Sequence, residues 1–262
     1  SINLDKKVSY YLPKIGSGYA NAKIQDVLNM NIINAYTEDY KKAYSSSFLH
    51  EPVGGWRLTK NVDKHLSQEL YLNTIKSKKN RNLINKSNLA FYKSANTDVV
   101  GLIVEKISGK PLRHWMLRAV EAAGFEEGIY IASDRYGMPW MSGGGCLITR
   151  DFLRMGLLFA RKGKGVGNRK IGSASFLDQT VKNVGPKYMN LSENKYLYYS
   201  NSTMVSGNII GHSGYGGQFL AVNLKTGNVA AFFSVLETKS ATKESYKVDM
   251  INMLIDIVNT KY

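Results

Sequence analysis

The stretch FYKSANTDVVGLIVEKISGKP, residues 91–111, carries the clearest structural pattern in the sequence. Its apolar residues recur at the spacing of one helix face: Val99, Val100, Ile103, Val104 and Ile107. Asn96 or Thr97 is placed to cap the start of a helix, and Gly109 followed by Pro111 is placed to end it. We therefore predict a helix that begins near residue 97, with Tyr92 and Ser94 just ahead of its N-terminus.

The same patterns predict further elements on both sides. Pro111 suits the first turn of a second helix that Gly124 ends, and Thr149 is placed to cap a third helix over residues 150–161. In the last third, strand-like segments are separated by Asn and Gly turns, at residues 196–199, 209–211, 218–224 and 229–236. Residues 240–260 then form an amphipathic pattern typical of a helix that covers a sheet.

This order of elements predicts an α+β or mixed α/β fold. We assign residues 1–190 to a mainly helical region and residues 191–262 to an antiparallel sheet with its closing helix, within one compact unit. No apolar run reaches the length of a bilayer-spanning helix.

Composition limits the chemistry. The single cysteine, Cys146, excludes an internal disulfide and is interpreted as a small core residue, and the four histidines lack paired spacing for zinc. We predict no metal and no cofactor. The net charge of +15 is concentrated in residues 76–86 and 161–170, which indicates a solvated basic face, with an anionic envelope polymer or nucleic acid as alternatives. Aromatic interleaving is lacking, so no specific nucleic-acid site is predicted.

Tyr92 is the first candidate for chemistry. It lies just ahead of a predicted helix N-terminus, where unpaired backbone N–H groups and the helix dipole favour negative charge. With a lysine nearby, a tyrosine there can serve as a general base, although an ordinary phenol keeps its proton at neutral pH. The alternative is that Tyr92 packs as an ordinary side chain and that Ser94 and Asn96 only cap the helix.

The second candidate is the segment HSGYGGQ, residues 212–218, between two predicted strands. Its glycines allow a substrate to approach the strand closely, and the backbone N–H of Tyr215 can serve as one donor of an oxyanion hole. The alternative is a glycine-rich turn with a satisfied His212. The triple glycine at residues 143–145 and the following Thr149-Arg150-Asp151 are interpreted as structural.

In order and spacing, these motifs resemble the penicillin-recognising serine hydrolases. The resemblance rests on the following segments: Leu4-Asp5-Lys6-Lys7-Val8 with Tyr11-Leu12-Pro13, Tyr92-Lys93-Ser94, Gly109-Lys110-Pro111-Leu112, the triple glycine with Thr149-Arg150-Asp151, and His212-Ser213-Gly214. The segments Tyr92–Asp98 and Glu38-Asp39-Tyr40 are most similar to the branch of 6-aminohexanoate-dimer hydrolases and class C-like esterases.

The resemblance implies a β-lactamase/transpeptidase-like fold and a serine acyl-enzyme, with nucleophile and lysine in an S-x-x-K box. By resemblance Tyr92 is the base, and Ser94 stands where many relatives have asparagine. His212-Ser213-Gly214 replaces the K-T-G box, and Tyr40 lies on a substrate-facing loop. We expect the S-x-x-K box upstream of residue 1, together with an N-terminal helix and strands. The matches at 192–195 and 240–243 follow Tyr92 and are rejected, as is Lys225-Thr226-Gly227 in a hairpin turn.

The sequence therefore predicts a serine hydrolase for a small amide or ester substrate. There are two alternatives. One is a non-catalytic binding protein of the same fold, and the other is a fragment whose fold is completed by another chain. The substrate and the oligomeric state are left open. Periplasmic or extracellular location is favoured over the cytoplasm.

Overall fold

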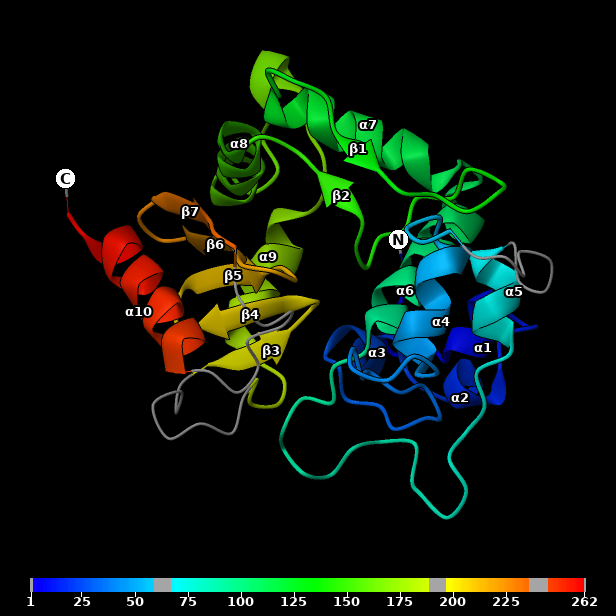
Figure 1. The fold of residues 1–262 in the computed structure, drawn as a ribbon. Coiled ribbons are helices and arrows are strands. Elements are labelled where there is room, and N and C mark those ends of the chain that lie inside the picture. Colours follow the sequence, from blue (N-terminus) through cyan, green and yellow to red (C-terminus); the bar gives the residue numbers. More distant parts are fainter. Residues whose placement is uncertain (1, 59–66, 189–196, 236–244, 262) are drawn as a thin grey trace. The chain divides into compact units, whose positions relative to one another are not determined.

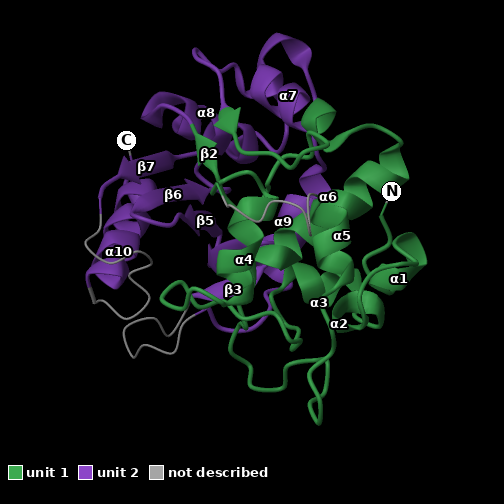
Figure 2. Cartoon of the chain, turned by 45° about the vertical axis from the view of Figure 1, so that its right-hand side comes forward, with its two compact units in different colours: residues 1–115, 130–146 green, residues 116–129, 147–262 purple. Residues whose placement is uncertain are grey.

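The computed structural model describes residues 2–58, 67–188, 197–235 and 245–261. The chain forms two compact units (Figure 2): unit 1 holds residues 1–115 and 130–146, and unit 2 holds residues 116–129 and 147–262. These units do not follow the predicted division at residue 190, because the helices between residues 147 and 188 are grouped with the sheet. Among the described residues, no helix combines the length and apolar character needed to cross a membrane.

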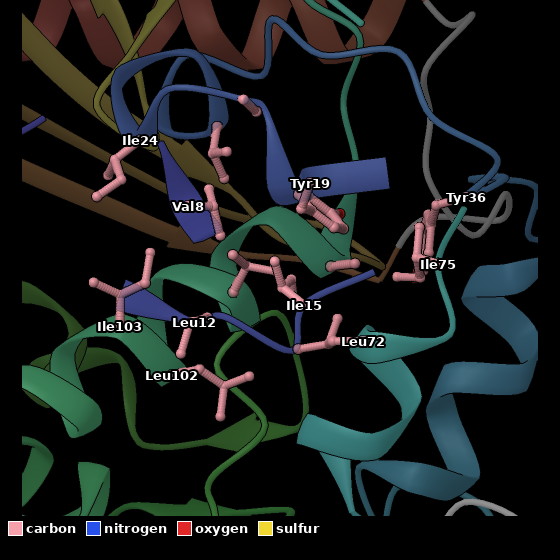
Figure 3. Packing of buried hydrophobic residues seen from close by; sticks show 14 of the residues in the cluster. Val8, Leu12, Ile15, Tyr19, Ile24, Tyr36, Leu72, Ile75, Leu102 and Ile103 are labelled. Atoms are coloured by element: carbon pink, nitrogen blue, oxygen red, sulfur yellow. The ribbon is translucent and has the colours of Figure 1, made fainter. Parts of the chain in front are cut away.

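Unit 1 is built mainly from helices (Figure 1). They are α1 (Val8–Tyr11), α2 (Ser17–Ala20), α3 (Ile24–Leu28), α4 (Ser46–Val53), α5 (Gln68–Asn73) and α6 (Ser94–Ser108). Two short strands, β1 (Tyr130–Ile131) and β2 (Gly145–Cys146), pair antiparallel. Val8, Tyr19, Leu72 and Ile103 are buried in one core cluster that gathers around α6 (Figure 3). Val99, Leu102 and Ile103 of α6 are buried in this cluster, so the helix packs its apolar face against the core of unit 1.

The N-terminus of α6 differs from the prediction. The helix begins at Ser94, so Asn96 and Thr97 lie inside it and neither is its cap. Asn96 is buried instead, where its Nδ2 donates to the Val27 carbonyl at 3.1 Å and its Oδ1 accepts from the Tyr19 hydroxyl at 3.0 Å. The predicted C-terminus is confirmed, since Gly109 adopts the left-handed conformation with φ of 62°.

The helix α7 (Leu112–Ala123) begins in unit 1 and ends in unit 2. The remaining elements of unit 2 are α8 (Thr149–Ala160), a 3₁₀ turn η1 (Val166–Asn168), α9 (Ala174–Lys182), β3 (Tyr198–Ser200), β4 (Thr203–Ser206), β5 (Ile209–Ser213), β6 (Gln218–Asn223), β7 (Val229–Phe233) and α10 (Ser245–Asn259). The predicted helices at 112–123 and 150–161 are confirmed. However, Thr149 is the first residue of α8 and not its cap, which is Ile148.

The five strands of unit 2 form an antiparallel meander in the order β3-β4-β5-β6-β7. Alternation along β6 gives the sheet two apolar faces. Leu220 and Val222 belong to a cluster with Phe152 of α8, whereas Phe219 and Ala221 line a small apolar pocket with Ile251 of α10. The sheet is therefore covered by α8 on one face and by α10 on the other.

Two smaller predictions fall on described residues. Lys225-Thr226-Gly227 lies in the turn between β6 and β7, as predicted, with φ of 84° at Gly227. The prediction of a buried Cys146 was wrong, because β2 pairs only with β1 and leaves this side chain exposed. The two S-x-x-K matches at 192–195 and 240–243, and the predicted strand ends at residues 196 and 236, lie outside the described residues.

Candidate functional site

The predicted site residues fall into two groups, each within one unit. Tyr40, Tyr92 and Ser94 belong to unit 1, near the N-terminus of α6. His212, Ser213, Gly214 and Tyr215 belong to unit 2, at the end of β5 and in the turn that follows it.

Glu38 links two of the predicted residues in unit 1. Its Oε2 accepts from the Ser94 backbone N–H at 2.8 Å, and its Oε1 accepts from the Ser94 hydroxyl at 2.5 Å. The Tyr40 hydroxyl also donates to Oε1. Ser94 is the first residue of α6, so Glu38 satisfies an otherwise unpaired N–H of the helix and places a carboxylate at its positive end. Sequence reasoning noted the segment Glu38-Asp39-Tyr40 but gave no role to the acid.

Burial shifts the pKa values of both Glu38 and Tyr40. Burial raises the pKa of Glu38, and the hydrogen bonds from Ser94 and Tyr40 and the charge of Lys93 oppose that rise. Burial and the adjacent Glu38 carboxylate raise the pKa of Tyr40 well above that of an ordinary phenol. Tyr40 is therefore a hydrogen-bond donor at neutral pH and is unsuited to act as a base.

Lys93 places a cation beside Tyr92 in the chain. The Lys93 side chain is buried, its Nζ donates to the Tyr36 carbonyl at 2.6 Å, and it lies 4.4 Å from the centre of the Phe91 ring. Burial lowers the pKa of Lys93 to about 8. Tyr92 itself is 39% exposed. The arrangement combines an accessible phenol, a helix N-terminus and a buried ammonium on consecutive residues.

The second group occupies a glycine-rich turn. His212 and Ser213 are the last residues of β5 and pair with Leu220 and Phe219 of β6. The Gly214 N–H donates to the Gln218 carbonyl at 2.7 Å, and a Cβ atom at Gly214 would lie 2.5 Å from Gln218 Oε1. Only glycine fits here without movement of Gln218.

Tyr215 lies at the exposed tip of this turn, with 50% of its surface accessible. Ser213 makes one contact that sequence reasoning missed, a hydrogen bond of 3.4 Å with the Tyr188 hydroxyl. Tyr188 lies in a loop ahead of β3, and its role could not be recognised without the fold, because 25 residues separate it from Ser213.

Asp98 of α6 and His50 of α4 form a buried ionisable pair. His50 Nε2 and Asp98 Oδ2 are 3.9 Å apart, and both side chains are completely buried. The Ser142 N–H donates to Asp98 Oδ1 at 3.1 Å, and the Tyr36 hydroxyl lies 3.3 Å from His50 Nδ1. Burial lowers the pKa of His50 to about 3 and raises the pKa of Asp98 to about 7. The pair is therefore uncharged in the folded protein at mildly acidic pH, with the proton on Asp98.

The chain is similar to known hydrolases in sequence and in fold. No family model matches the chain. Over 173 residues the chain is 30% identical to the 6-aminohexanoate-dimer hydrolase of Paenarthrobacter ureafaciens, and this match covers 63% of the chain and 41% of that protein.

Solved structures match almost the whole chain. A Bacillus anthracis protein described as a "putative 6-aminohexanoate-dimer hydrolase" has a TM-score of 0.74 and 20% identity, covering 98% of the chain and 66% of that protein. A β-lactamase/D-alanine carboxypeptidase from Pseudomonas syringae has a TM-score of 0.59 and 9% identity, covering 99% and 78%. The chain has the β-lactamase/transpeptidase fold.

The fold predicted from the motif order is thus confirmed, as is the resemblance to the 6-aminohexanoate-dimer hydrolases. The chain spans less than two thirds of the length of both hydrolase relatives.

Proposed function

We propose that the whole protein is a serine hydrolase that cleaves an amide or ester bond through an acyl-enzyme. The observation that carries the proposal is the arrangement at the N-terminus of α6. Tyr92 is partly exposed, the next residue Lys93 is buried, and Glu38 holds Ser94 at the first turn of the helix. The similarity over 173 residues to a 6-aminohexanoate-dimer hydrolase supports it.

In this proposal the nucleophile is the serine of an S-x-x-K box upstream of Leu4. Its oxygen attacks the substrate carbonyl carbon while Tyr92 takes up its proton. The backbone N–H of Tyr215 and that of the nucleophile donate to the oxyanion. The intermediate then collapses, and the proton moves to the leaving amine or alcohol. Water attacks the acyl-enzyme by the reverse proton path and releases the acid.

The other predicted residues bind substrate. Tyr40 and Ser94, both held by Glu38, face one part of the substrate, and His212, Ser213 and Gly214 line the strand edge along which another part lies. Tyr40 keeps its proton in this scheme, in agreement with its raised pKa, and donates it to Glu38, so toward the substrate its oxygen acts as an acceptor.

Intact-mass spectrometry of the full natural protein, before and after a fluorophosphonate probe, tests the proposal. We expect a mass gain of one probe per chain on a serine of an S-x-x-K box. Absence of any adduct on the folded full protein would favour the non-catalytic binding protein.

A specific observation also favours binding of an anionic envelope polymer by the same protein. The side chains of Lys76, Lys78, Lys79, Arg81 and Lys86 are all exposed on one segment of unit 1. Such a segment attracts polyanions in a salt-dependent manner. We expect retention on a teichoic acid or heparin matrix that is lost in about 0.5 M salt, and that is weaker when these five residues are changed to glutamine.

A further inference from the structure

Ser213, the middle residue of the His212-Ser213-Gly214 motif, lies at the end of a chain of three polar side chains within unit 2. The Tyr188 hydroxyl lies 3.4 Å from Ser213 Oγ, and Lys247 Nζ donates to the Tyr188 hydroxyl at 3.3 Å. Tyr188 comes from the loop ahead of β3, Ser213 from the end of β5 and Lys247 from α10. The loop ahead of β3 and the helix α10 therefore both contribute a side chain to the hydrogen-bond chain that ends at Ser213.

Lys247 is an unusual residue in this position because it is only 5% exposed. Its ammonium lies 5.6 Å from the centre of the Tyr188 ring, which in turn stacks on Tyr199 at 5.7 Å. Among the described residues, no carboxylate oxygen lies within 4 Å of its Nζ. Burial of an ammonium is costly without compensation, and here the described compensation is the Tyr188 hydroxyl and ring.

The direction of the hydrogen bonds follows from what each group can donate. An ammonium only donates, so the phenol oxygen of Tyr188 accepts from Lys247. The ammonium polarises the phenol and makes it a better donor to Ser213 Oγ. Ser213 then accepts from Tyr188, and its own hydroxyl hydrogen is left to donate to a further acceptor. Ser213 is partly exposed, between the exposed His212 and Gly214, so that acceptor can be a bound substrate.

We propose that Lys247 and Tyr188 are positioning residues that hold the Ser213 hydroxyl as a hydrogen-bond donor to an acceptor oxygen of the substrate. The inference rests on the proposed function, because it concerns the same substrate site. Tyr188 contacts Ser213 directly, Lys247 contacts Tyr188, and both act on the substrate through Ser213. The positive charge of Lys247 further favours an acceptor oxygen that carries negative charge.

Steady-state kinetics of the full natural protein test the inference, with p-nitrophenyl butyrate as a neutral probe and a chromogenic cephalosporin as a carboxylate-bearing probe. We expect Tyr188→Phe and Lys247→Met to raise KM for the cephalosporin about 3- to 10-fold, the size of one lost hydrogen bond. The value of kcat should change less than about 3-fold, and the effect on the butyrate KM should be smaller. Lys247→Arg, which keeps a donor, should restore most of the affinity.

Tyr198→Phe on β3 is the matched control, since the Tyr198 hydroxyl makes no hydrogen bond within the described part of the chain. Thermal unfolding of every variant separates a positioning role from a folding defect. Unchanged KM values in folded Tyr188→Phe and Lys247→Met proteins would overturn the inference while leaving the hydrolase proposal intact.

The inference can also be tested if the proposed hydrolase function is wrong. If the wild-type protein turns over neither probe, equilibrium binding of the cephalosporin replaces KM as the measurement. The same variants should then weaken binding about 3- to 10-fold relative to wild type. Equal affinity in wild type and variants, or no binding by the wild type, would overturn the inference.

Discussion

Glu38 shows how much of the candidate site depends on one side chain. Three donors converge on its carboxylate, two from Ser94 and one from Tyr40. The carboxylate thereby ties a loop residue to the first turn of a helix 56 residues further along the chain. Since the helix dipole also favours a negative charge at this point, the contact orders the loop and the helix N-terminus together.

We expect Glu38→Gln to destabilise the protein by about 2 kcal/mol, because an amide can neither accept from both donors as well nor offset the helix dipole. Urea unfolding measures the effect. Asp39→Asn is the matched control. Among the described residues, the Asp39 carboxylate forms an ion pair with the exposed Lys42 and accepts from the Lys41 N–H, and an amide oxygen can also accept from that N–H. Equal stability of the two variants would show that Glu38 does not organise this end of α6.

Replacing Tyr92 tests its role as the base. Tyr92→Phe in the complete protein removes only the hydroxyl, and kcat should fall by a factor on the order of 100 or more, the usual range for a lost general base. Tyr44→Phe is a suitable control, since Tyr44 is 91% exposed. Full turnover by Tyr92→Phe would refute the assignment of the base.

The buried His50 and Asp98 pair predicts an unusual pH dependence. Asp98 has its pKa raised from 3.8 to about 7, so its contribution to stability is complete below pH 3.8 and is lost as pH rises through 7. His50 has its pKa lowered from 6.5 to about 3, so its contribution is complete above pH 6.5 and is lost as pH falls through 3. Between about pH 4 and 6.5 the two effects oppose each other.

Asp98→Asn should expose this cancellation, because asparagine keeps an acceptor for the Ser142 N–H but does not titrate. The stability of the variant should rise relative to wild type by up to about 3 kcal/mol between pH 4 and 6.5, since only the His50 effect remains. Urea unfolding at several pH values measures both proteins. Parallel pH profiles would show that Asp98 does not bind a proton on folding.

At the scale of elements, local patterns determined what could be predicted. The helices α6, α7 and α8 and the strands β5, β6 and β7 follow from apolar periodicity and glycine or proline boundaries. By contrast, α9 and the four-residue β4 were not predicted. Ser173 caps α9 and its apolar residues Phe176, Leu177 and Val181 follow a helical spacing, so the signal for this helix was present in the sequence and was missed. The strand β4 is too short to show a periodic pattern. The start of α6 was misplaced for a different reason: the group that satisfies its first N–H is the distant Glu38, which a local capping rule cannot find.

The packing of α8 against the sheet gives a prediction at this scale. A Cβ atom at Gly156 would lie 2.4 Å from Val229 Cγ1 and 3.0 Å from Leu220 Cδ1. Gly156→Ala should therefore destabilise the protein by about 1–3 kcal/mol, despite the better helix propensity of alanine. Gly128→Ala, where a Cβ would meet no atom within 4 Å, is the control. A stabilised Gly156→Ala protein would mean that α8 does not approach β7 so closely.

At the scale of the whole molecule, the order and spacing of motifs were enough to predict the fold. They are spread from Leu4 to Gly214, and the fold that they predicted agrees with the solved structures that match the chain. The contacts that hold the motif residues in place, such as that between Lys247 and Tyr188, could not be predicted from motif order. Lys247 reaches Tyr188 across 59 residues of chain, and nothing in the local sequence of α10 distinguishes this lysine from a solvated one.

The motif order along the whole chain also gives a prediction for the position of the nucleophile. We expect the isolated 262-residue chain to form no fluorophosphonate adduct, because its two S-x-x-K matches both follow Tyr92, whereas the motif order of the resemblance requires the box ahead of Leu4. The full natural protein should be labelled, and peptide mapping should place the adduct outside residues 1–262. A folded isolated chain that is labelled at Ser192 or Ser240 would contradict this placement and would require a catalytic arrangement different from that of the β-lactamase/transpeptidase fold.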